Sequence, residues 1–222
     1  MNSTKSYINS SIGKKIIMAI SGLMLYGFVI MHMLGNLQVF AGPEKLNAYA
    51  KFLQDLGGLL WVARFGLLAA AGAHIFVAIK ISLENKAARP VPYYNQQTNV
   101  ASYASRTMKY SGLIVLAFLI YHLLHFTLGV TDAEAGRLKE MHNVYGMVVA
   151  GFSNPIVSFA YIFAIGLLCI HLSHGFFSLF QSLGINQPEY DTKLKLTANI
   201  FALGIFLGNA SMPIAVLLKI VA

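Results

Sequence analysis

Long apolar stretches separated by short polar segments dominate the pattern along this chain. Five stretches are long enough to cross a hydrocarbon core of roughly 30 Å, which takes about 20 residues of helix. We place them at residues 15–36, 59–83, 108–130, 154–180 and 196–220. Strands of a membrane barrel would instead show short segments of alternating polarity. The pattern therefore predicts an all-α membrane protein with five transmembrane helices, forming one domain over residues 1–222.

The polar segments between these helices predict the topology. Lysine and arginine are most frequent in the N-terminal segment and in the loops 84–107 and 181–195. Basic loops stay on the cytoplasmic side, so the N-terminus is predicted to lie inside. The loops 37–58 and 131–153 are then outside. Within the first of these, residues 44–56 have apolar positions at helical spacing and predict a short interfacial helix.

Composition supports this class of protein. The chain is 57% hydrophobic and only 11% charged, which is too apolar for an ordinary soluble domain. Its net charge of +8 comes from residues at helix ends and not from a basic soluble face, so no nucleic-acid partner is expected. The single cysteine, Cys169, excludes disulfides and is predicted to be a packing residue. The first apolar stretch is too long for a signal-peptide core, so we expect a retained helix.

Histidines recur inside the apolar stretches, where ionisable side chains are costly and usually functional. Four of the five helices carry at least one, namely His32, His74, His122 with His125, and His171 with His174. Glycine and alanine lie beside them and allow close approach of a helix or a flat ligand. Histidines on the inner faces of four helices predict bis-histidine haem, held without thioether bonds because the chain has no Cys-x-x-Cys-His motif. A polar contact to a neighbouring helix, or a proton relay, is the alternative. His142, in an outer loop, is predicted to be a surface residue.

Depth in the membrane predicts which histidines share an iron. At about 1.5 Å per residue, His32 lies roughly 25 Å and His122 roughly 20 Å above the cytoplasmic helix ends. His74 and His171 each lie roughly 15 Å above them. The predicted pairs are therefore His32 with His122 toward the outside and His74 with His171 toward the inside. Spacing alone does not decide whether His122 and His171 or the histidines three residues after them are the ligands. In each case the later histidine lies on nearly the same helix face.

These residues resemble the di-haem cytochrome b membrane anchor of succinate dehydrogenases and fumarate reductases, in its five-helix, single-chain form. The likeness rests on His-x-x-x-Asn at the end of the first helix (His32, Asn36) and on the Leu-Asn-Ala that follows. It also rests on Tyr-His-Leu-Leu-His in the third helix and on His-x-Ser-x-Gly with a later Gly-Ile-Asn-Gln-Pro around the fourth. The resemblance implies that His32, His74, His122 and His171 are the haem ligands.

The resemblance also implies partners and cofactors that this chain does not itself encode. A flavoprotein subunit with FAD and an iron–sulfur subunit would dock on the cytoplasmic side of a bacterial inner membrane. Electrons would pass through two b haems between dicarboxylate chemistry and a quinone, usually menaquinone in this type of anchor. The chain would then act as one subunit of an enzyme whose dicarboxylate chemistry resides in its partners.

A quinone needs hydrogen-bond donors at its carbonyl groups and a nearby group for its protons. We predict its site near the outer haem, at Asn36, Gln54, Asp55 and His125, although Gln54 and Asp55 could merely solvate a surface helix. Certain members of the resembled family carry a glutamate two residues before the ligand in the fourth helix, where this chain has Cys169. A carboxylate proton route through the membrane is therefore in doubt.

Two other classes of protein remain open on the sequence. A di-haem cytochrome b of a hydrogenase or a formate dehydrogenase also uses membrane histidines. A transporter with a histidine relay would differ more, because transporters tend to have broken helices or inverted repeats, whereas the two halves here run in parallel. A red protein with a reducible b-type spectrum would exclude the transporter.

Overall fold

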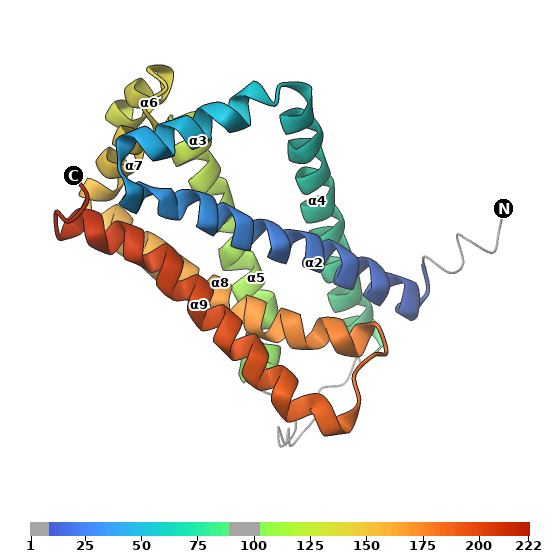
Figure 1. Cartoon of the computed structure of the whole chain (residues 1–222). Helices are drawn as coiled ribbons and strands as arrows, with labels where there is room; N and C mark the ends of the chain where they lie inside the picture. Colours follow the sequence, from blue (N-terminus) through green and yellow to red (C-terminus); the bar gives the residue numbers. More distant parts are fainter. Residues whose placement is uncertain (1–8, 89–102) are drawn as a thin grey trace.

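The computed structural model describes residues 9–88 and 103–222 (Figure 1). Its long helices are α2 (Ser11–Asn36), α4 (Gly58–Ala87), α5 (Tyr103–His122), α8 (Pro155–Ser182) and α9 (Asp191–Leu217). Short helical segments η1 (Leu37–Ala41), η2 (Leu123–Leu128) and η3 (Pro188–Tyr190) adjoin them. Five segments are long and apolar enough to span a membrane, and the described residues contain no strand. The predicted five-helix, all-α membrane fold is confirmed.

Capping residues explain where these helices begin and end. The hydroxyl of Ser10 accepts a hydrogen bond of 3.0 Å from the amide of Gly13 at the start of α2. Asn154 caps α8 in the same way, and Pro155 follows at a position where a missing amide hydrogen costs nothing. Gly129 ends η2 with a positive φ of 73°, which glycine adopts without strain.

Parts of two predicted loops are helical. The outer segment 131–153 contains α6 (Ala133–Glu140) and α7 (Val144–Ser153), so its prediction as a plain loop is wrong. Lys193 and Lys195 lie in the first turns of α9 and not in the preceding loop. These segments lack the length or the apolar content of a spanning helix, so the hydropathy pattern gave no signal for them. Most of the predicted cytoplasmic loop 84–107 lies outside the described residues.

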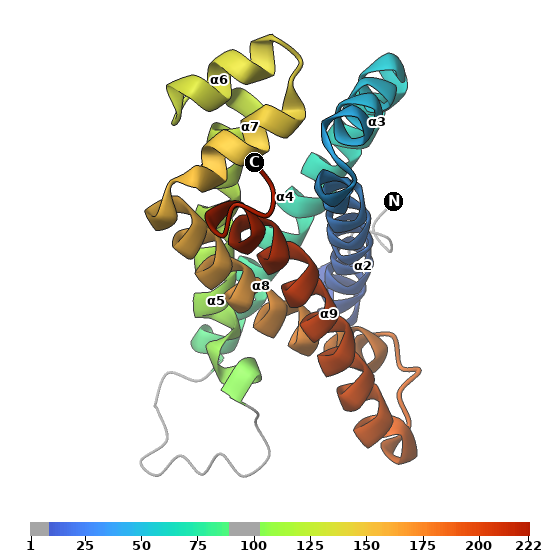
Figure 2. The ribbon, with the colours of Figure 1, turned by 60° about the vertical axis from the view of Figure 1, so that its left-hand side comes forward.

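The short helix predicted at residues 44–56 is confirmed as α3 (Pro43–Asp55). It lies with α6, α7 and the C-terminus at one end of the molecule (Figure 2). Asn47 of α3 donates to the side-chain oxygen of Asn143 at 3.3 Å and accepts from the amide of Tyr145 at 2.9 Å. The side-chain amide of Asn47 therefore links α3 to the start of α7.

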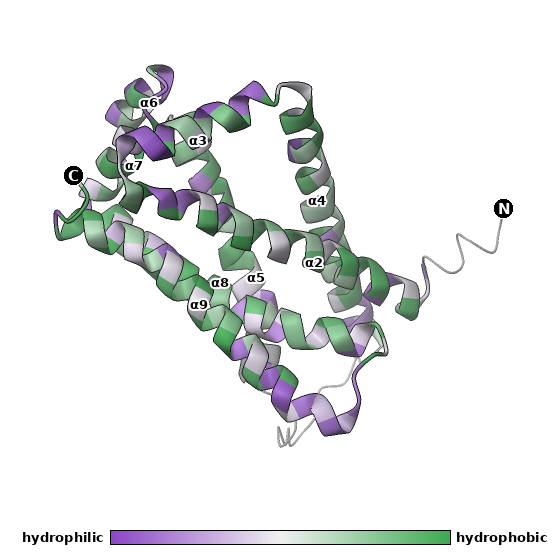
Figure 3. Cartoon of the chain, viewed as in Figure 1, coloured by the Kyte–Doolittle hydropathy of each residue, from purple (hydrophilic) through white to green (hydrophobic). Residues whose placement is uncertain are grey.

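The spanning helices form two pairs, with α9 alongside. Helix α4 packs along α2, and α5 packs along α8, which also contacts α2 and α9. Neither α2 with α5 nor α4 with α8 forms a packed pair among the described residues. Apolar residues cover much of the long helices, while polar residues collect on α3, on α6 and at the start of α9 (Figure 3). Lipid would contact these apolar outer faces. Between α2 and α5, and between α4 and α8, contact is left to side chains.

An ion pair joins α2 to α4 near the start of the first helix. The ammonium group of Lys14, a residue that is only 6% exposed, contacts the carboxylate of Glu84. In the sequence, Lys14 belongs to a lysine-rich segment without acidic neighbours. The structure supplies an acidic neighbour from α4, because pairing of the two helices brings the end of one to the start of the other.

Candidate functional site

His32 on α2 and His122 on α5 face each other across the interior. Their ring centroids lie 5.7 Å apart and their planes are inclined by 89°. An imidazole nitrogen binds a metal at about 2.0–2.1 Å, so two rings on opposite sides of one metal have centroids roughly 6 Å apart. The amide nitrogen of Asn36 donates to Nε2 of His32 at 3.0 Å. Binding of a metal through that Nε2 would require Asn36 to move away.

His74 on α4 and His171 on α8 form a second facing pair, with centroids 6.4 Å apart and planes inclined by 64°. The hydroxyls of Ser21 and Ser111 lie 3.3 Å from Nδ1 of His74 and of His171, respectively. Because Ser21 donates its own hydrogen to the carbonyl of Ile17 at 2.7 Å, it is left to accept from the His74 ring. A hydrogen on Nδ1 leaves Nε2 as the metal-binding nitrogen.

The two serines belong to a repeat that relates α2 to α5. Six residues recur ninety positions later with the same spacing: Ser21, Gly22, Leu23, Phe28, Ile30 and His32 match Ser111, Gly112, Leu113, Phe118, Ile120 and His122. Each helix thus supplies one histidine of the outer pair and a Ser-Gly step beside one histidine of the inner pair. The spacing within single helices did not predict that these serines contact histidines, and the internal repeat is the sequence signal that relates the two positions.

Glycine in this repeat leaves room for the rings. A Cβ atom on Gly22 would lie 3.3 Å from Cε1 of His74, and one on Gly112 would lie 3.5 Å from Cε1 of His171. The first distance is tighter than an ordinary contact, so a side chain at Gly22 would press on the ring. The position of His74 therefore depends on the absence of a side chain at Gly22.

His125 lies in different surroundings from His122. It is 1% exposed, stacks on Phe126 at 4.1 Å, and lies so close to α7 that a Cβ on Gly151 would be 2.9 Å from its Nε2. Its Nδ1 is 3.0 Å from the hydroxyl of Tyr161. The same hydroxyl is 3.4 Å from Nδ1 of His122, so both histidines lie toward α8, although η2, which contains His125, is π-helical.

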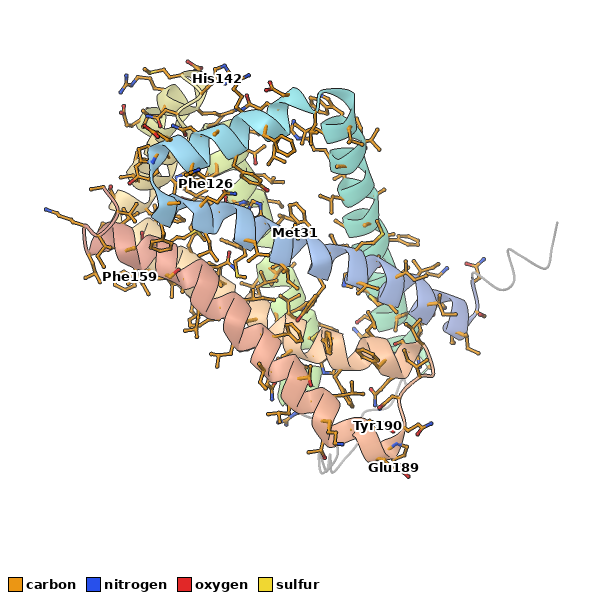
Figure 4. The ribbon with its side chains drawn as sticks, viewed as in Figure 1. Met31, Phe126, His142, Phe159, Glu189 and Tyr190 are labelled. Carbon is orange, nitrogen blue, oxygen red and sulfur yellow. The ribbon has the colours of Figure 1, made fainter. Side chains whose placement is uncertain are left out.

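The other sequence candidates lie apart from the two facing pairs. Nε2 of His174 is 3.0 Å from the hydroxyl of Ser178 on its own helix. His142 is exposed at the α6 end of the molecule (Figure 4), as expected of a surface residue. Cys169 is buried within the apolar core, and its prediction as a packing residue is confirmed.

The four predicted quinone-site residues do not form one cluster. Asn36 contacts the outer histidine pair, whereas His125 is buried against α7. Gln54 and Asp55 lie exposed at the end of α3, where Asp55 pairs with Lys51 at 3.0 Å. No hydrogen bond joins these four residues to one another within residues 9–88 and 103–222. The quinone site stays a prediction.

The donor set suits haem better than a bare metal ion. No group of three or more histidine, cysteine or acidic side chains is placed to hold a metal in the described part of the chain. A haem iron needs only two axial ligands from the protein, because the porphyrin supplies the others. Two pairs of opposed imidazoles at bonding separation, with the glycine of each repeat beside one ring of the inner pair, fit that requirement.

Comparison with known proteins identifies the family. The family model described as succinate dehydrogenase/fumarate reductase transmembrane subunit matches residues 85–208, more than half of the chain. The chain therefore belongs to this family of membrane-spanning subunits of an oxidoreductase complex and associates with its catalytic subunits. The matched region contains His122 and His171 and does not reach His32 or His74. Neither the search of curated proteins nor that of solved structures gave a match.

Proposed function

We propose that this chain is a di-haem cytochrome b anchor that carries electrons between a quinone and the catalytic subunits of succinate dehydrogenase or fumarate reductase. One haem b would lie between His32 and His122, and the second between His74 and His171. The observation that supports this assignment is the opposition of two ring pairs across helices that do not otherwise pack together. The family match gives no support to the alternatives that the sequence left open, namely a cytochrome b of a hydrogenase or formate dehydrogenase and a transporter.

Neighbouring residues orient the histidine ligands and keep their imidazole rings neutral. When bound, the haems supply one-electron transfer. Ser21 and Ser111 accept from Nδ1 of the inner histidines, which keeps the lone pair of Nε2 available. On α2, Ser21 marks the level of the inner pair and His32 that of the outer pair, eleven residues later. At 1.5 Å per residue this sets the two levels roughly 16 Å apart along the helix.

The orientation and the partners follow from charge and family. We assign the N-terminus and the loops 84–107 and 181–195 to the cytoplasmic side of a bacterial inner membrane, where basic segments are retained. An iron–sulfur subunit would dock on that face, with an FAD flavoprotein beyond it. Menaquinone is the proposed quinone, close to the outer pair, where Asn36 contacts His32. Gln54, Asp55 and His125 do not cluster with Asn36, so each is a separate candidate contact to be tested by substitution.

Single replacement of each histidine in the purified complex tests this assignment. We expect His32→Ala and His122→Ala to remove one and the same haem, and His74→Ala and His171→Ala to remove the other. Haem content and reduced-minus-oxidised spectra would report which haem is lost. The matched control is His174→Ala, which should retain both. Loss of a haem from this control, with His171 dispensable, would refute the ligand assignment.

A further inference from the structure

Tyr161 places its hydroxyl between two histidines of the neighbouring helix. The residue lies on α8 and is 3% exposed. Its oxygen is 3.0 Å from Nδ1 of His125 and 3.4 Å from Nδ1 of His122. Neither the family nor the haem-ligand assignment gives this tyrosine a role, yet it is the polar group that touches the outer ligand from α8.

Aromatic rings hold the phenol ring in place. Four of them surround it with centroid distances of 5.1 to 5.9 Å: Phe118, Tyr121, Phe126 and Phe152. They come from α5, η2 and α7, so three segments of the chain enclose one side chain of α8. Such a cage fixes the position of the hydroxyl oxygen and leaves it little freedom to seek other partners.

The hydrogen count gives the bridge a direction. A tyrosine hydroxyl has one hydrogen to donate and lone pairs with which to accept. For His122 to bind iron through Nε2, its Nδ1 must carry a hydrogen, and Tyr161 must accept it. The hydroxyl then donates its own hydrogen to Nδ1 of His125. The hydrogen bonds thus run from His122 through Tyr161 to His125, and they use Nδ1 of both histidines and the hydroxyl in a buried site.

We propose that Tyr161 is the positioning residue of the outer haem site, a role that rests on the proposed function. Its hydroxyl fixes the tautomer and the ring orientation of His122, as outer-shell partners of metal-binding histidines do. In the inner pair, the hydroxyls of Ser21 and Ser111 have the same role toward Nδ1 of the two histidines. An acceptor on Nδ1 also makes the imidazole a stronger electron donor, which favours the ferric state of the iron.

Tyr161→Phe in the complete complex tests the proposal, because it removes the hydroxyl and keeps the ring of the cage. We expect the midpoint potential of the outer haem to rise, its ferric low-spin EPR signal to move, and its affinity to fall roughly 10- to 100-fold. The inner haem should keep its wild-type potential and signal. Tyr121→Phe is the matched control, since it removes a hydroxyl from the same aromatic cluster, and it should change neither haem.

The possible failures are distinguishable. A wild-type complex without haem would refute the proposed function itself. A wild-type complex with both haems, whose outer haem is unaltered by Tyr161→Phe, would overturn only the role of Tyr161. If Tyr161→Phe lost both haems, His125→Leu decides, because it removes the acceptor of the tyrosine hydrogen and leaves the cage intact. A smaller shift of the outer haem in the same direction supports the proposal, and no shift would assign Tyr161 to folding alone.

Discussion

His32 and His122 bring their rings within 5.7 Å although the helices that carry them, α2 and α5, do not pack along each other. Membrane helices usually associate through small residues that let their backbones approach closely. Here two such residues, Gly22 and Gly112, lie beside histidine rings instead. The interior of this bundle is therefore arranged around imidazole groups, and the extensive helix contacts are those of α2 with α4, of α5 with α8 and of α8 with α9.

Crowding at Gly22 should disturb the inner haem site selectively. In Gly22→Val, the new side chain presses on the ring of His74, and such overpacking costs typically about 1–3 kcal/mol. This corresponds to roughly 5- to 150-fold weaker binding of the inner haem. Haem titration of the purified complex would measure it. Gly204→Val on α9, where a Cβ meets nothing within 4 Å, is the control and should bind both haems normally.

Hydropathy and depth predicted much of this arrangement. The five spans, the short helix α3 and the ring pairs depend on patterns within single helices, such as apolar length and the position of His32 along its helix. Helix boundaries were less accurate, because polar first turns such as the one that holds Lys193 carry no apolar signal.

Contacts between helices required the structure. The hydrogen bond between His122 and Tyr161 depends on the rotation of α8 relative to α5, and the burial of His125 depends on a π-helical turn and on the backbone of Gly151. The pairing of Lys14 with Glu84 likewise follows from the packing of α4 on α2. Spacing within one helix carries no information about these relations.

Crosslinking tests the proposed topology. We expect lysine-reactive crosslinks to the iron–sulfur subunit from Lys86 at the end of α4 and from Lys193 at the start of α9. Lys45 on α3 and Lys139 on α6 lie at the other end of the bundle and should give none. Mass spectrometry of the crosslinked complex would identify the sites, and crosslinks from Lys45 or Lys139 in place of Lys86 or Lys193 would reverse the orientation.

Asp55 offers a specific test of the quinone site. If its carboxylate takes part in proton transfer with the quinol, Asp55→Asn should slow quinol turnover roughly 100-fold with haem content unchanged. Lys51→Ala breaks the same exposed ion pair and keeps the carboxylate, so it should have little effect. Turnover of Asp55→Asn at the wild-type rate would remove Asp55 from the site.

Electron transfer through this anchor should be electrogenic. With quinone chemistry at the outer haem and dicarboxylate chemistry inside, each electron crosses most of the membrane. This movement is worth about 2.3 kcal/mol per charge at 100 mV, or roughly 4.6 kcal/mol for two electrons. None of the eight acidic residues of the sequence lies deep in a membrane-spanning segment, where it could carry a compensating proton. A voltage-sensitive dye in sealed proteoliposomes would measure the potential. Rapid turnover that neither generates a potential nor responds to an uncoupler would show electroneutral transfer.

The haem content of the wild-type complex tests the central claim most directly. Extraction of haem from the purified complex, together with a reduced-minus-oxidised spectrum and EPR of the ferric state, counts the haems and reports their ligation. Two ring pairs predict two b haems per chain, both low-spin with two nitrogen ligands and separately titratable. A complex that assembles with its catalytic subunits but contains no haem, only one, or a high-spin haem with an open coordination position would contradict the account.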